Sequence, residues 1–244
     1  MYVTNCVRGD GFGAQYQNII WAILYAELNS FEFYYTPFSS MEHNYDNDPN
    51  FLFKKEELIN IINNCPTVSE LSKDVMIKEL CGGVNGVNFD EIENNLTGCS
   101  NLESFKKIKK VFHQNKTPIF DSNIINVAVH VRKQNTEDNH ILGIFGDDYF
   151  LDMMDYIRNT YTGKIVFHVY SQGDEKNFLH FKNEDVVLHL NESIELTFYS
   201  MVTAQILVMS KSSLSYTAAM LSDGIVYYLP FWHKPASSWI IKKL

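Results

Sequence analysis

The sequence predicts an α/β protein with two Rossmann-like domains and a cleft between them, the second domain holding a five-stranded parallel sheet. Short runs rich in Val and Ile alternate with helix-like segments from about residue 124 to the end. This alternation is typical of a parallel sheet covered by helices on both faces. The chain has 244 residues, 45% of them hydrophobic, which suits one or two compact domains of roughly 100 to 200 residues each.

The apolar runs of the second half are short and bounded by polar residues or glycine, as buried strands are. Segments between them have apolar residues three and four positions apart, or begin with a capping residue, which predicts helices. Ligands of such sheets bind beyond the carboxyl ends of the strands. The expected strands cover residues 124–131, 164–170, 185–190, 205–209 and 224–229, and the expected helices 148–161, 175–181, 193–204 and 213–221.

The first half has a less regular pattern. A strand over 2–7 leads through a glycine-rich turn into an amphipathic helix over 15–29. The stretch 114–123, which contains Pro118, is the expected linker, so the predicted domains are residues 1–120 and 121–244. Between the first helix and the linker we expect a strand over 31–35, a loop over 38–53 and helices near 54–63, 68–80 and 102–113.

Charge and composition narrow the classes of function. The net charge of −9 disfavours nucleic acid as a partner, because a phosphate-binding face is normally basic. The sequence has no apolar stretch approaching the roughly 18 residues of a membrane span, and its start lacks the order of a signal peptide. We therefore expect a soluble, cytoplasmic protein. The four cysteines are too dispersed for a disulfide framework or a zinc site, so reduced thiols are expected at Cys6, Cys65, Cys81 and Cys99.

The turn between the first strand and the first helix contains small residues. Gly11-Phe12-Gly13-Ala14-Gln15 would let backbone amides approach an anionic or sugar group at the helix N-terminus. The spacing is not Gly-x-Gly-x-x-Gly, and no suitably placed acidic residue follows to hold a ribose, which disfavours a dinucleotide dehydrogenase. The alternative interpretation is a tight turn that binds nothing.

Cationic residues end the first strand of the second domain. His130-Val-Arg132-Lys133 places charge at the predicted cleft, where Arg132 would give a diphosphate charge-assisted and bidentate hydrogen bonds. His130 alone could equally be a core histidine whose hydrogen bonds are satisfied.

Hydroxyl groups follow the ends of two predicted strands, the second and the fourth of this domain. Ser212 and Ser213 open the helix after the fourth strand, where free backbone amides stabilise an anion, although Ser213 could be only an N-cap. Ser171 and Asp174 end the second strand and could line the same cleft. The plainer interpretation of that segment is a glycine turn with a capping Asp.

Carboxylates suited to acid–base chemistry are Glu137 and Asp138, just after Arg132, unless they belong to a solvated loop. Asp46-Asn-Asp48 has the Asp-x-Asp form of a divalent-metal site. It lies in a polar turn with no apolar strand before it, so we expect no metal site.

Three of these segments together resemble the inverting, metal-independent fucosyltransferases of GT-B type. They are Gly11 to Gln15, His130 to Lys133 and Ser212-Ser213-Leu-Ser-Tyr-Thr-Ala-Ala219, against family patterns such as Gly-x-Gly-Asn-Gln, His-x-Arg-Arg and Ser-x-Phe-Ser-x-x-Ala-Ala. The resemblance implies a GT-B fold and a nucleotide-sugar donor. It also implies a glycan or glycoconjugate acceptor and no cofactor.

The resemblance assigns roles to the domains and their residues. It implies that residues 121–244 bind the donor, with Arg132 on the diphosphate and Ser212 and Ser213 on the phosphates. It also implies that residues 1–120 are the acceptor side, with the glycine-rich turn facing the donor and acceptor. Glu137 or Asp138 is then the base by family position, with Asp10 in reserve.

Two positions depart from the family patterns. Ala14 replaces an Asn, and Lys133 replaces a second Arg, which reduces a fork of donors to a point charge. The donor sugar therefore stays open between fucose on GDP and another such as xylose on UDP. A non-catalytic glycan-binding module and a different nucleotide-dependent enzyme are the alternatives.

Overall fold

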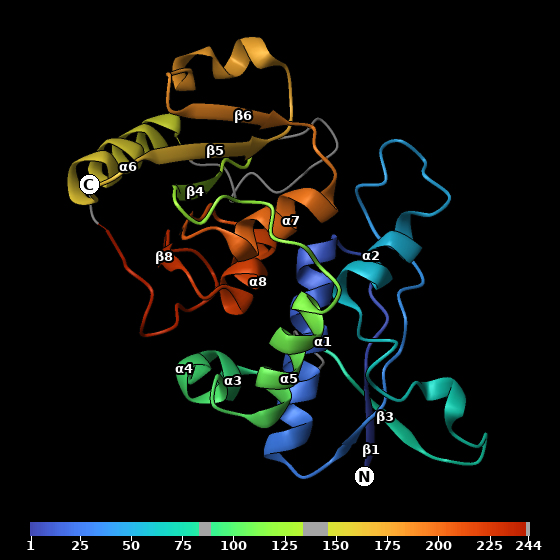
Figure 1. Cartoon of the computed structure of the whole chain (residues 1–244). Coiled ribbons are helices and arrows are strands. Elements are labelled where there is room, and N and C mark those ends of the chain that lie inside the picture. The colour runs from blue at the N-terminus through green and yellow to red at the C-terminus, as the bar shows by residue number, and fades with distance from the viewer. Residues whose placement is uncertain (83–88, 134–145, 243–244) are drawn as a thin grey trace. The chain divides into compact units, whose positions relative to one another are not determined.

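The computed structural model describes residues 1–82, 89–133 and 146–242, and its contacts divide the chain into two compact units, Met1–Lys116 and Thr117–Leu244 (Figure 1). The first unit contains a three-stranded parallel sheet and the second a five-stranded parallel sheet. The predicted α/β class and the predicted five-stranded sheet are thus confirmed. The cleft between two domains, and the roles of those domains, stay predictions.

The second unit has a doubly wound sheet with strand order β6-β5-β4-β7-β8. The chain moves outward from β4 to one edge, returns, and then moves to the other edge, so the order reverses between β4 and β7. The strands are β4 (Ile125–His130), β5 (Ile165–Ser171), β6 (Val186–Leu190), β7 (Ile206–Val208) and β8 (Ile225–Tyr227). The helices are α6 (Asp147–Thr160), α7 (Ile194–Thr203) and α8 (Ser213–Leu221), and the predicted helix over 175–181 is the 3-10 helix η3 (Glu175–Phe181).

Alternation along the strands gives this sheet two different faces. Val127 and Val129 of β4 belong to a buried apolar cluster with Met153 of α6 and Phe178 of η3. Their neighbours on β4 therefore project to the opposite face, the side of α7 and α8, which pack against each other. That second face carries the polar residues of the site.

The first unit contains β1 (Tyr2–Asn5), β2 (Glu32–Phe33) and β3 (Ile77–Leu80) in the order β2-β1-β3. Carboxylate oxygens of Glu27, near the end of its long helix, accept hydrogen bonds from the backbone N–H groups of Glu103 (3.2 Å) and Ser104 (2.8 Å). These bonds pair backbone N–H groups in the first turn of α5, to which the N-cap residue Leu102 gives no side-chain hydrogen bond. The helices are α1 (Phe12–Leu28), α2 (Phe51–Ile59), α3 (Asp90–Asn94), α4 (Leu96–Cys99) and α5 (Glu103–His113), with the 3-10 helix η1 (Val68–Glu70).

The helix predicted over 68–80 is wrong. A capping box between Thr67 and Glu70 starts one turn of 3-10 helix, which ends at Leu71. Ile77 to Leu80 then form a strand that pairs with β1 in the register Tyr2↔Ile77. The apolar residues of this segment have a spacing that suits a helix, but backbone pairing with the buried strand β1 overrides that local preference.

The expectation of four reduced thiols is also wrong. Cys6 and Cys81 form a disulfide, with Cα atoms 5.2 Å apart, while Cys65 and Cys99 are free. The register of the strands explains the pairing, because Asn5 lies opposite Leu80 and the cysteines are the next residues along each chain. Their separation of 75 residues in the sequence gives no hint of this proximity.

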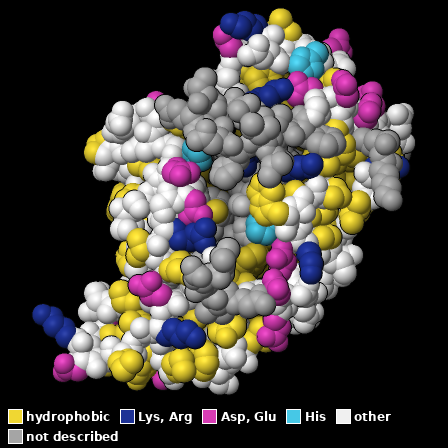
Figure 2. Space-filling model, turned by 180° about the vertical axis from the view of Figure 1, so that it is seen from behind, with side chains coloured by type: hydrophobic (Ala, Val, Ile, Leu, Met, Phe, Trp, Pro, Cys, Tyr) yellow, Lys and Arg dark blue, Asp and Glu magenta, His cyan; other side chains and the backbone are white. Residues whose placement is uncertain are grey.

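On the face seen in Figure 2, Lys and Arg side chains lie interspersed among Asp and Glu side chains. Of the helices that the structure describes, none is both long and apolar enough to cross a bilayer.

Gly224 provides a test of how closely the turn before β8 packs against the backbone that leads into β7. A Cβ atom at this position would lie 2.5 Å from the carbonyl oxygen of Ala204 and 2.8 Å from that of Gln205. Because both are backbone atoms at the start of β7, we expect Gly224→Ala to lower the free energy of unfolding by about 2 kcal/mol or more. Urea unfolding measures this change. Gly146→Ala is the control, since its Cβ would meet nothing within 4 Å, and an equal loss in both variants would contradict the account.

Candidate functional site

The carboxyl ends of β4 and β7 bring His130 and Ser210 together. His130 is 8% exposed, and its Nδ1 lies 3.0 Å from Oγ of Ser210. Burial, aided by the charge of Arg132, lowers the pKa of His130 to about 3. The imidazole is therefore neutral and joins the ends of two adjacent strands, which supports the interpretation of His130 as a hydrogen-bonded core residue beside the site.

The next turn leads into the N-terminus of α8. Ser212, rather than Ser213, is the N-cap, because its Oγ accepts a hydrogen bond of 3.2 Å from the N–H of Leu214. The Ser215 hydroxyl donates to the carbonyl of Ser210 at 3.2 Å and so closes the turn from inside. A helix N-terminus presents N–H groups and a positive dipole end, which together suit an anion. Ser213 is the first residue of the helix at this point.

Lys133 is bound by its own chain. Its ammonium group forms an ion pair with the Asp147 carboxylate at the start of α6 and lies 5.4 Å from the ring centroid of Phe178. His180 contacts the same carboxylate at 2.9 Å. The charge of Lys133 is thus matched within the protein, so it contributes less than predicted to an anion site. Arg132, one residue earlier, is half-buried and carries a guanidinium, a planar group with several hydrogen-bond donors.

Ser171 and Asp174 have separate roles. The Ser171 hydroxyl donates to the carbonyl of Val131 at 2.6 Å, which ties the end of β5 to the end of β4. Asp174 is exposed, pairs with Lys176 at 2.8 Å, and lines a cavity of about 710 Å³. Of the two, only Asp174 lines this cavity.

The cavity lies between the turns that follow β5 and β6. Gly173 has φ of +125°, a conformation that favours glycine. Its N–H donates to Oδ1 of Asn191 at 2.9 Å, and Nδ2 of Asn191 donates back to its carbonyl at 3.0 Å. This pair of bonds fixes one turn against the other. Glu175 and Glu192 add two acidic residues to the lining, and sequence analysis missed both, although Glu192 follows a predicted strand end.

In the first unit, the side-chain amide of Gln15 organises the glycine-rich turn. Its Nε2 donates to the carbonyls of Asp10 at 2.6 Å and Ser40 at 2.9 Å. A Cβ on Gly11 would lie 2.9 Å from the ring of His43, so the turn needs glycine there. Phe12 and Gly13 are buried at the start of α1. The predicted role of Gln15 as a ligand stays a prediction, because its amide serves the turn itself.

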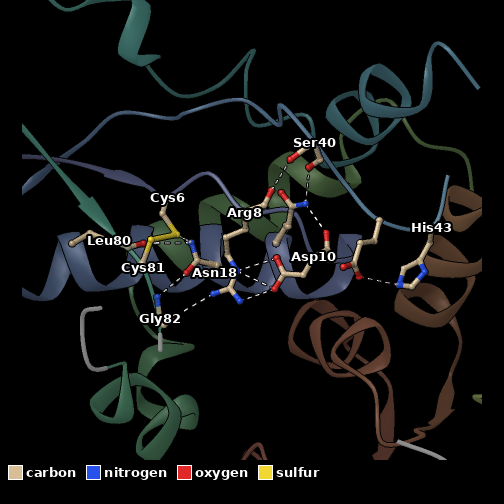
Figure 3. Close-up of polar contacts among 11 residues, drawn as sticks. Cys6, Arg8, Asp10, Asn18, Ser40, His43, Leu80, Cys81 and Gly82 are labelled. Atoms are coloured by element: carbon tan, nitrogen blue, oxygen red, sulfur yellow. Dashed lines mark hydrogen bonds and ion pairs between the residues drawn. A yellow bond between two sulfur atoms is a disulfide. The ribbon is translucent and has the colours of Figure 1, made fainter. Parts of the chain in front are cut away.

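Asp10 forms a bidentate ion pair with Arg8 (Figure 3). Nε and Nη2 of Arg8 donate to the carboxylate at 2.9 and 2.6 Å, and Nη1 donates to the carbonyl of Gly82 at 3.1 Å. Gly82 follows the disulfide and also donates its N–H to Asn18. The oxygens of this carboxylate already accept hydrogen bonds from a guanidinium within the turn, which counts against Asp10 as the base.

The other carboxylates give little information on catalysis. Glu137 and Asp138 lie outside the described residues. Asp48 pairs with Lys54 at 2.6 Å, and that bond, with the N–H of Asn50, lowers the pKa of Asp48. Across residues 1–82, 89–133 and 146–242, no group of three or more His, Cys, Asp or Glu residues is arranged to hold a metal ion.

Comparisons with known proteins return only distant structures. No family model matches the chain, and no curated protein matches it. NodZ alpha-1,6-fucosyltransferase soaked with GDP-fucose has a TM-score of 0.43 at 11% identity, covering 96% of this chain and 99% of that one. E. coli heptosyltransferase WaaC with ADP has a TM-score of 0.41 at 10% identity, covering 95% and 88%. Likenesses this weak assign the chain to no family, and the site is characterised by its own sheet topology and side chains.

The buried histidines predict how stability depends on pH. The unfolded chain binds a proton at each histidine near pH 6.5, whereas the pKa of folded His130 is about 3. The stability contribution is therefore complete above about pH 6.5 and is lost as the pH falls toward 3, by up to about 1.4 kcal/mol per pH unit for this one group. Urea unfolding at several pH values should show this slope reduced in His130→Asn. His180→Asn, at an exposed position, is the control, and equal slopes in wild type and His130→Asn would refute the assignment.

Proposed function

We propose that the chain is a metal-independent, inverting glycosyltransferase that moves a sugar from a nucleotide diphosphate to a hydroxyl of a glycan or glycoconjugate. The observation that carries the proposal is the N-terminus of α8, which opens beside the carboxyl end of β4 where the strand order reverses. In doubly wound sheets this point is where a nucleotide binds. Two of the three motifs that resemble the fucosyltransferases, His130 to Lys133 and Ser212 to Ala219, lie at this edge.

The diphosphate would be bound by Arg132 and the helix N-terminus together. Arg132 offers a planar fork of donors, and Ser212 and Ser213 bring the first turn of α8 to the same strand ends. Lys133 supports Arg132 indirectly, by anchoring the start of α6 through Asp147. As the sugar departs, the negative charge that develops on the diphosphate would be stabilised by these fixed donors.

The cavity beyond β5 and β6 has the size and polarity for a nucleobase. Its 710 Å³ falls among typical ligand pockets of about 300 to 1,000 Å³. Leu188 and Leu190 form an apolar part of the cavity wall. Asp174 and Glu192 also line the cavity, and their carboxylates can accept hydrogen bonds from N–H groups. Guanine presents adjacent ring and amino N–H donors, so the carboxylates favour a guanine nucleotide over a uracil nucleotide.

In the proposed reaction, the acceptor hydroxyl attacks the anomeric carbon as the bond to the diphosphate breaks, which inverts the configuration. A carboxylate takes the hydroxyl proton. Glu137 and Asp138 are the proposed bases, since the ion pair with Arg8 occupies Asp10. The sugar is proposed to be fucose or another such as xylose, because Ala14 and Lys133 depart from the fucosyltransferase patterns.

A thermal-shift panel tests the donor site. GDP, UDP, GDP-fucose, UDP-xylose, UDP-glucose and NAD are each added with EDTA and with manganese. We expect one nucleotide diphosphate, with a guanine base, to raise the melting temperature in EDTA, because ligand at 100 times its Kd stabilises the folded state by about 2.7 kcal/mol. Stabilisation only with manganese would overturn the metal-independent mechanism. No shift with any ligand would support a non-catalytic module instead.

Substitution of the two neighbouring cations distinguishes their roles. Arg132→Ala should reduce transfer at least about a hundredfold, because it removes charge-assisted bonds to the departing diphosphate. Lys133→Ala should cost activity less and stability more, because its partners are Asp147 and Phe178. Donor turnover and urea unfolding of both variants measure these effects. Near-normal turnover by Arg132→Ala would remove this residue from the mechanism.

A further inference from the structure

Four polar side chains form a ladder across the face of the five-stranded sheet that carries α7 and α8. Nε2 of His168 on β5 lies 3.2 Å from Oδ1 of Asn126 on β4. Nδ1 of His168 lies 3.0 Å from Nε2 of His189 on β6, and Nδ1 of His189 lies 3.7 Å from Oε1 of Glu192. The ladder therefore runs from the central strand to the wall of the cavity, since Glu192 lines it.

The hydrogen bonds at one end of the ladder fix its direction. Nδ2 of Asn126 donates to the carbonyls of Asp121 and Ile124, at 3.0 and 2.9 Å, so its Oδ1 is an acceptor. Nε2 of His168 must then carry a hydrogen, and Nδ1 of the neutral ring is an acceptor. It follows that Nε2 of His189 donates to His168, which leaves Nδ1 of neutral His189 as a lone pair facing Glu192.

The two imidazole rings are placed so that a hydrogen bond joins their facing nitrogens. Their centroids are 5.2 Å apart and the bonded nitrogens 3.0 Å apart, which places both nitrogens near the line that joins the rings. The two nitrogens point at each other. To chelate a metal ion, they would both have to point at a third position. The next proton that the ladder binds therefore goes to Nδ1 of His189, where the carboxylate of Glu192 stabilises the imidazolium.

Aromatic neighbours and burial oppose protonation of both histidines in the ladder. Tyr170 of β5 stacks on His189 at 4.6 Å, and Phe120 packs against His168 at 4.8 Å. Burial lowers the pKa of His168 to about 4 and lowers that of His189 as well. The titratable groups that face His189 are His168 and Tyr170 from β5 and Glu192 from the turn after β6.

We propose that His189 is a positioning residue for Glu192, and that its proton decides whether this carboxylate is available to a ligand in the cavity. When His189 is neutral, its lone pair offers the carboxylate no hydrogen bond, and Glu192 can accept from the ligand. When His189 is protonated, it forms an ion pair with Glu192 and competes with the ligand. The binding part of this proposal rests on the proposed function, in which the cavity holds the base of a nucleotide sugar.

Imidazole nitrogen NMR spectra of the full chain test the ladder without any ligand. Over about pH 4.5 to 8, His168 should keep its Nε2–H tautomer to lower pH than His189, which should change from the Nε2–H tautomer to the imidazolium. Glu192→Gln should lower the midpoint of His189 by about one pH unit, because it removes the opposite charge. An unchanged midpoint in that variant, or His189 with its hydrogen on Nδ1 at pH 8, would overturn the proposal.

Binding of nucleotide sugars tests the consequence. A GDP-sugar or UDP-sugar serves as the probe, because its esterified diphosphate keeps a constant charge over this pH range. From about pH 7.5 to 4.5, a range that reaches well below the lowered pKa of His189, we expect the affinity of wild type to fall about tenfold, the effect of about one charge-assisted hydrogen bond. His189→Gln keeps a donor for His168 but does not titrate, so its affinity should change little, while His180→Asn should behave as wild type.

The two possible failures give different results. If the proposed function fails, no nucleotide sugar binds at any pH, while the NMR titration still decides whether His189 and Glu192 are coupled. If nucleotide sugars bind with the same pH dependence in wild type and His189→Gln, His189 does not position Glu192, and the proposed function stands without it.

Discussion

Parallel pairing of β4 on both of its sides is the constraint on which the rest of the second unit depends. The strand bonds to β5 over six residues and to β7 over three, so the carboxyl ends of three strands meet at one edge. Burial of this central strand leaves no water to solvate polar groups at its end. Each such group therefore needs a partner from a neighbouring strand, as His130 finds in Ser210 and the Val131 carbonyl finds in Ser171.

The two faces of the five-stranded sheet differ in polarity. The face toward α6 is packed with apolar side chains such as Val129, Phe167 and Met153. The opposite face carries His130, Tyr170 and His189 in one row, because these residues are register partners on β4, β5 and β6. A row of aromatic and imidazole rings at the carboxyl edge keeps the strands packed while providing hydrogen-bonding groups, which a purely apolar face would lack.

The sequence allowed good predictions where local pattern and tertiary structure agree. The five strands of the second unit lie within the predicted runs or one residue beyond them, because buried parallel strands form short runs rich in Val, Ile and Leu. The prediction failed over 68–80 and at Cys6 and Cys81, where pairing between β1 and β3 decides the outcome. The ion pair between Lys133 and Asp147 could not be predicted either, because a sequence shows which residues carry charge but not which of them form ion pairs.

Charged side chains at the carboxyl edge of the sheet form specific ion pairs. Asp147 engages both Lys133 and His180, and so fastens the start of α6 and η3 below the end of β4. Arg132, after β4, and the dipole of α8, after β7, add further positive charge at this edge. A helix N-terminus is fixed by its backbone and needs no reorganisation when a ligand arrives. The start of α8 is thus a rigid part of the carboxyl edge, because the pairing of β7 with β4 fixes the strand that leads into it.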